Sequence, residues 1–263
     1  MSPAQRSFAR KTAARLSARS AGPASAATAL AAPTAQSVGT DDRQREYELQ
    51  RAALGQDLGV LKNIQSISAK IEAKAAMLPK YDPWVDGVIE AAVAAEAAGK
   101  LIGQDDVLVE TMIWAIDCTD HVRAMPRVRA FFRNGMKLPQ RFDRTPGCLV
   151  AEEFAETALK AMSSDKAHIA DVFQLSEIAQ ITEDHDMPDP VRAKLHKAIG
   201  MAIERATDAA EDGDIAAAGG KKRAYETARH AYTRALTFDE KSGVKKRIER
   251  LESQIKKLAE PSD

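Results

Sequence analysis

Two groups of acidic side chains are the candidates for a catalytic or metal-binding role in this chain. The acids of these two groups are Asp105, Asp106, Asp184, Asp186 and Asp189. Clustered carboxylates can hold Mg²⁺, which would support hydrolysis of a phosphodiester. The same acids also suit a structural role, because carboxylates cap helix starts and favour the positive end of the helix dipole. The capping interpretation is the plainer one, so the sequence predicts no definite metal site.

Other motifs that would define an enzyme are missing from the sequence. Gly219-Gly220-Lys221-Lys222 lacks the spacing and the Ser or Thr of a phosphate-binding loop. There is no nucleophile elbow, no Cys-x-x-Cys and no His-Glu-x-x-His. The two cysteines, Cys118 and Cys148, are too few for a disulfide framework and fit a reducing compartment. We therefore predict no cofactor, with Mg²⁺ required only if the acids hydrolyse DNA, and whether the chain is an enzyme stays open.

The formal net charge of zero conceals a basic amino-terminal arm, residues 1–40, which contains no acid. Its cations are Arg6, Arg10, Lys11, Arg15 and Arg19. The other 223 residues carry 33 basic and 38 acidic side chains. Such an arm is typical of nucleic-acid binding, because cations displace counterions from phosphates. Its composition predicts a flexible segment, and an organelle transit peptide is the alternative interpretation.

The sequence pattern around these residues predicts helices throughout. Apolar residues recur at three- and four-residue steps from residue 41 to 77, which predicts one helix that ends at Pro79 and Pro83. Its apolar stripe is expected to pack on the body of the protein or to mediate self-association as a homo-oligomer. The residues expected to self-associate are Leu54, Leu58, Leu61, Ile64 and Ile71. Further amphipathic helices are predicted over 83–99, 105–117, 122–135, 149–162, 166–181, 190–210, 221–236 and 243–258.

This pattern predicts an all-α fold with three parts: a disordered basic arm (1–40), a helical region (41–138) and a second helical region (139–263). Within them, Thr111–Gly135 and Leu195–Leu236 look like helical hairpins. A tetratricopeptide-like repeat and ordinary antiparallel packing both explain these hairpins. No apolar run approaches the ~18 residues that cross a bilayer, so we expect a soluble protein without membrane contact.

Several short motifs occur in order along nearly the whole chain. They are Ser2-Pro3-Ala4-Gln5-Arg6, Leu78-Pro79 with Pro83-Trp84-Val85-x-Gly87-Val88, Asp105-Asp106-x-Leu108 leading to Trp114, Arg144-Thr145-Pro146, Glu152-Glu153, Asp186-Met187-Pro188-Asp189 with Val191-Arg192-Ala193-Lys194-Leu195-His196-Lys197, and Gly243-Val244-Lys245-Lys246-x-Ile248-Glu249-Arg250-Leu251-Glu252. Together they resemble the small terminase subunit of temperate contractile-tailed phages that package DNA from cohesive ends, a subunit also labelled the endonuclease subunit. The first motif lies in the arm, which argues against a transit peptide.

The resemblance implies a function in viral DNA packaging. A small terminase is expected to bind the packaging site on phage DNA, form a multimer and recruit the large ATPase subunit that fills the procapsid, in the host cytoplasm. A metal-dependent endonuclease that cuts the cohesive-end site is the first alternative, and its acids would be those named above. A helical-repeat adaptor that binds only proteins is the second alternative.

Overall fold

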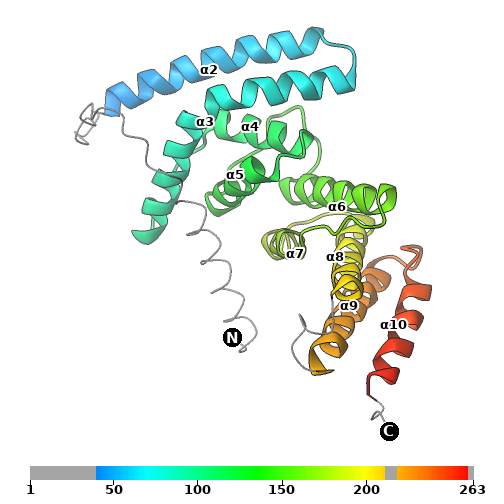
Figure 1. Ribbon diagram of the computed structural model, residues 1–263. Helices are drawn as coiled ribbons and strands as arrows, with labels where there is room; N and C mark the ends of the chain where they lie inside the picture. The colour runs from blue at the N-terminus through cyan, green and yellow to red at the C-terminus, as the bar shows by residue number, and fades with distance from the viewer. Residues whose placement is uncertain (1–39, 211–217, 260–263) are drawn as a thin grey trace, which may run out of the picture. The chain divides into compact units, whose positions relative to one another are not determined.

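The computed structural model describes residues 40–210 and 218–259. Within these residues it contains nine helices and no strand, which confirms the all-α prediction (Figure 1). The helices are α2 (Thr40–Asn63), α3 (Ile67–Ala97), α4 (Asp106–Asp117), α5 (His121–Arg133), α6 (Pro146–Ser164), α7 (Val172–Ile181), α8 (Asp189–Ala209), α9 (Ala218–Phe238) and α10 (Lys245–Lys257). No helix in this part of the chain is long and apolar enough to cross a membrane.

The prediction that Pro79 and Pro83 end a helix was wrong, because both lie inside α3. The helix ends earlier, at Asn63, and restarts after Ser66, whose hydroxyl accepts a hydrogen bond from the Ala69 amide. A proline removes one backbone hydrogen bond and clashes with the preceding turn, but tertiary packing can outweigh this cost. In α3 the side chains of Tyr81 and Val85, beside the prolines, are fully buried. The helix accommodates the prolines by changing direction along its length (Figure 1).

Helix α4 is buried along its length, since every residue from Val107 to Ile116 is buried. It packs against α3, α5 and α6. Asp82 of α3 adds charged contacts to α5, because its carboxylate accepts hydrogen bonds from Arg123 Nε at 2.9 Å and Arg127 Nη2 at 2.7 Å. Burial opposes the charge of Asp82, but the two guanidinium groups outweigh it and hold its pKa below the ordinary value of 3.8. Helices α3, α4 and α5 therefore form one interlocked group.

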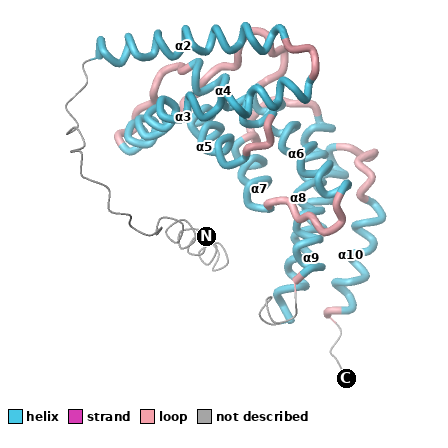
Figure 2. Tube along the Cα trace, turned by 45° about the horizontal axis from the view of Figure 1, so that its top comes forward, coloured by secondary structure: helices cyan, strands magenta, loops and turns pink. Residues whose placement is uncertain are grey.

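The carboxyl-terminal helices pack in chain order: α6 and α7 contact α8, α8 contacts α9, and α9 contacts α10 (Figure 2). Both predicted hairpins are therefore consecutive helix pairs in contact, α4 with α5 and α8 with α9. Small residues allow α8 and α9 to approach closely, and a Cβ atom added at Gly200 would lie 2.7 Å from Tyr232 Cδ1. Contacts of α4 with α6 and of α5 with α7 cross the segment around the predicted boundary at 138/139. The division into regions 41–138 and 139–263 stays a prediction.

Candidate functional site

The first acidic group lies at the start of α4, where Asp105 is the N-cap. One carboxylate oxygen accepts a hydrogen bond from the Leu108 amide at 2.8 Å, and the other accepts one from Trp84 Nε1 at 3.1 Å. The Asp105 side chain is nearly buried, and this burial raises its pKa above the usual range. Tyr47 stacks on Trp84 and accepts a hydrogen bond from the Asp106 amide at 3.0 Å. Both oxygens of Asp105 therefore serve the local structure.

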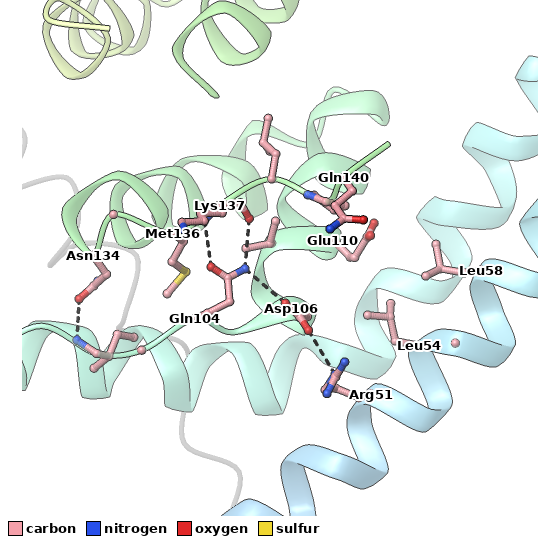
Figure 3. A pocket seen from close by; sticks show the side chains of 17 residues that line it. Arg51, Leu54, Leu58, Gln104, Asp106, Glu110, Asn134, Met136, Lys137 and Gln140 are labelled. Carbon is pink, nitrogen blue, oxygen red and sulfur yellow. Dashed lines mark hydrogen bonds and ion pairs between the residues drawn. The ribbon is translucent and has the colours of Figure 1, made fainter. Parts of the chain in front are cut away.

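A pocket of about 720 Å³ opens beside Asp106, between α2, the start of α4 and the segment from Asn134 to Gln140 (Figure 3). Asp106 pairs with Arg51 of α2 at 3.2 Å. On the other side, Gln104 accepts a hydrogen bond from the Lys137 amide at 2.9 Å and donates one to its carbonyl at 3.1 Å. The remaining acid, Glu110, accepts a hydrogen bond from Arg141 at 2.6 Å. Each acid of this pocket thus has an arginine partner, and neither carboxylate is left unpaired as a general base would be.

The second acidic group lies between α7 and α8. The side chains of Asp184, Asp186 and Asp189 are exposed there, and Asp189 is the first residue of α8. Asp186 contributes its main-chain carbonyl, which accepts a hydrogen bond from the Thr145 hydroxyl at 2.6 Å. Among the described residues, no three His, Cys, Asp or Glu side chains gather as a metal site would require. The catalytic role of the five acids stays untested.

Several motifs of the resemblance meet in a groove of about 640 Å³ at the start of α6. Thr145 caps α6, accepting a hydrogen bond from the Cys148 amide at 3.1 Å. Arg144 pairs with Glu152, and Lys194 of α8 lies 3.3 Å from the same carboxylate and 2.5 Å from Glu156. These contacts join the segments around residues 144, 152 and 186–194, which are distant in sequence, so the motifs hold α6 against α8.

Most residues of the apolar stripe predicted for self-association pack in or against the core of the same chain. Leu54 and Leu61 are in the core, with 4% and 5% of their surface exposed. Leu58 and Ile64 are half-buried and pack on that core, whereas Ile71 is 36% exposed. Of the two alternatives, packing on the body therefore explains most of the stripe, and self-association stays a prediction. The arm with its five cations (Arg6, Arg10, Lys11, Arg15 and Arg19) lies outside the described residues.

Sequence reasoning missed a buried acid, Glu204 of α8, whose side chain is 1% exposed. It accepts a hydrogen bond from the Tyr232 hydroxyl of α9 and, at 2.6 Å, from Arg247 Nη1 of α10. Arg250 Nη2 lies 2.6 Å from its other oxygen. Burial and the neighbouring carboxylate raise the pKa of Tyr232. In the sequence, the available sign of this buried acid was a charged residue on a helix face of mostly small and apolar residues. Its partners on α9 and α10 could not be deduced from spacing alone.

Comparison with known proteins assigns this helical chain to a class of phage proteins. Residues 51–190 match the model of the phage small terminase subunit family. The chain is also 34% identical over 260 residues to the protein named "Terminase, endonuclease subunit" of Escherichia phage P2, covering 99% of this chain and 88% of that relative. The chain therefore belongs to the phage small terminase subunit family, which confirms the resemblance. No solved structure matches it significantly.

Proposed function

We propose that this small terminase subunit binds phage DNA at the cohesive-end packaging site and recruits the large ATPase subunit that moves the DNA into the procapsid. The observation that carries the proposal is membership of the family, together with similarity to a terminase subunit over nearly the whole chain. The protein would act in the host cytoplasm as a homo-oligomer. It needs no cofactor for binding DNA.

The basic arm is the proposed primary DNA contact. Its five cations stand in a segment without acids, and each phosphate that they neutralise would release counterions. Because such contacts carry no sequence information, the preference for the packaging site would come from contacts to base edges or from DNA shape.

An endonuclease function is the second candidate, favoured by the name of the phage P2 relative. It would require Mg²⁺ held by carboxylates. In the described residues Asp105 is occupied as a helix cap, and Asp106 pairs with Arg51. We therefore favour DNA recognition and propose that the large subunit performs the cleavage.

A single set of reactions tests these proposals. The purified full-length chain is mixed with duplex DNA that contains the phage cohesive ends, or with a scrambled duplex, with and without Mg²⁺ and without the large subunit. Preferential binding without cleavage is expected. Cleavage that depends on Mg²⁺ would establish the endonuclease candidate, and absence of any DNA binding would leave the protein-adaptor alternative.

The contribution of the arm is measured with a variant in which its five cations are replaced by alanine. Each lost phosphate contact should reduce the slope of log affinity against log salt by about 0.9. The matched control replaces the four arginines of the arm by lysine, which preserves the charge. If the alanine variant binds with unchanged slope, the arm is not a DNA contact.

A further inference from the structure

The charge of the body is divided between its two ends along the chain. Residues 45–188 carry 16 basic and 23 acidic side chains, a balance of −7. Residues 218–259, which contain α9 and α10, carry 12 basic and 5 acidic side chains, a balance of +7. The preceding segment 211–217 adds three acids. The net charge of the residues after the arm, taken as a single sum, therefore hides a strongly basic pair of helices, α9 and α10.

Helix α9 presents one continuous exposed face that carries no acid. Its members recur at three- and four-residue steps and so lie within an arc of about 80° along about 21 Å of helix. They are Arg223, Thr227, His230, Arg234 and Thr237, all exposed. The one acid of α9, Glu226, is half-buried and lies to the side of this face. The spacing thus aligns two arginines and a histidine in one row.

The cations of this face are not neutralised within the described chain. The Arg223 guanidinium has no ion pair there. Arg234 approaches Glu183 at 3.7 Å, but both side chains are exposed, at 43% and 60%, so the pair contributes little. By contrast, Arg247 and Arg250 of α10 are committed to Glu204. The charge of the α9 face remains available to a partner.

A half-buried histidine beside this face lies in the same positive surroundings. His196 of α8 stacks on Phe238 at the end of α9, with ring centroids 5.7 Å apart. Burial, assisted by electrostatic interactions with Arg234, Arg192 and His230, lowers its pKa to about 4. An anion placed near these cations would reduce their mutual repulsion.

The face is also held rigidly. On the opposite side of α9, Tyr232 packs against Gly200 and donates its hydroxyl to the buried carboxylate of Glu204. An anchored helix fixes the backbone positions of these residues, so their spacing is set before they meet a regular array of charges. Duplex DNA offers such an array, with one negative charge per ~1.7 Å of its axis.

We propose that the exposed face of α9 (Arg223, Thr227, His230, Arg234 and Thr237) binds the phosphate backbone of duplex DNA, as a second contact in addition to the basic arm. This inference rests on the proposed DNA-binding function and assigns a surface to it. The acidic balance of residues 45–188 would repel the duplex from that part and direct it toward α9 and α10. The contact positions the protein on DNA without reading its sequence.

The test uses the full-length chain with the variant Arg223→Gln/Arg234→Gln. The control, Lys100→Gln/Lys160→Gln, removes the same charge from exposed positions in the acidic part. Affinity for the cohesive-end duplex and for a scrambled duplex is measured across a salt series by fluorescence anisotropy. The α9 variant should lose up to about 1.8 of the salt slope, equally for both duplexes, while the control keeps the wild-type slope. Arg223→Lys/Arg234→Lys should restore it.

The outcomes separate this inference from the proposed function. Wild-type protein that fails to bind either duplex overturns the proposed function, and the inference with it. Wild-type binding with an α9 variant that matches the control overturns only the inference and leaves the proposed function standing. Circular dichroism and thermal unfolding of each variant test whether the fold is intact. We expect it to be intact, because all the substituted positions are exposed.

Discussion

Trp84 of α3 donates its indole N–H to Asp105 of α4 across 3.1 Å, so the N-cap of the most buried helix is itself held by a neighbouring helix. This relationship gives Asp105, one of the acids suspected of catalysis, a structural role. It also joins two motifs that are separate in the sequence, Pro83-Trp84 and Asp105-Asp106.

The first prediction follows from that contact. Asp105→Ala removes the acceptor for the Leu108 amide and leaves the Trp84 N–H without its partner, so the free energy of unfolding should fall by about 1–2 kcal/mol. Asp105→Asn retains an acceptor oxygen and should lose less. Denaturant unfolding of both variants measures this. If Asp105→Ala leaves stability unchanged but abolishes a DNA cleavage activity, the structural assignment is wrong.

The second prediction concerns two glycines, whose replacement by alanine should change the stability in opposite directions. Gly200→Ala would place a Cβ atom 2.7 Å from the Tyr232 ring and should cost about 1–3 kcal/mol of stability through overpacking. Gly87 lies inside α3, with nothing within 4 Å of an added Cβ. Gly87→Ala should therefore stabilise the protein by about 0.5–1 kcal/mol, because alanine favours the helix. Thermal unfolding of both variants measures these changes. Destabilisation by Gly87→Ala would contradict the open space that the structure shows around Gly87.

The third prediction concerns pH. The pKa of His196 is lowered to about 4 in the folded chain from its ordinary 6.5, so the folded state keeps this ring neutral where the unfolded chain binds a proton. Stability from this group should therefore fall as the pH drops from 6.5 to 4. NMR titration of the full-length protein should show His196 still neutral at pH 5.5. Arg234→Gln should raise its pKa; a titration midpoint near 6.5 in the wild type would refute the prediction.

The sequence predicted features that depend on neighbouring residues better than features that depend on contacts between distant segments. The periodic apolar positions predicted α4 and α8 closely, because a helix face is a local property. The stop at Pro79 and Pro83 was wrong, since the burial of Tyr81 and Val85 depends on helices that are distant in the sequence.

The candidate sites show the same limit. Acids in the first turn of α4 were foreseen as favourable to the helix dipole, and Asp106 lies there, with Asp105 as the N-cap just before it. The prediction that Asp186 or Asp189 caps the helix that follows was wrong, because Pro188 is the N-cap of α8 and no side chain caps it. The Tyr47 contact to Asp106 joins residues 59 positions apart, which spacing cannot reveal. The acidic balance of the body also concealed the basic face of α9, which becomes visible only when charge is counted by helix and combined with exposure.

The last prediction concerns self-association through α2, for which the structure points to different residues from those in the stripe. Replacing Leu54 or Leu61 would disrupt the core, since both are buried, and could not report on assembly. Leu49 and Val60 are 66% and 51% exposed, and their separation of eleven residues places them on the same face of α2. This exposed face is available to a second copy of the chain. Leu49→Lys/Val60→Lys should therefore shift the protein to smaller species in sedimentation velocity.

The control for this prediction, Val93→Lys/Val122→Lys, makes the same chemical change at exposed positions of α3 and α5, where 52% and 83% of the side-chain surface is accessible. It should leave the sedimentation profile unchanged, because the added charge alone does not break a contact that lies elsewhere. If both double variants sediment like the wild-type oligomer, assembly does not use this face of α2. If both dissociate equally, repulsion between the added charges, rather than loss of an apolar α2 contact, explains the change.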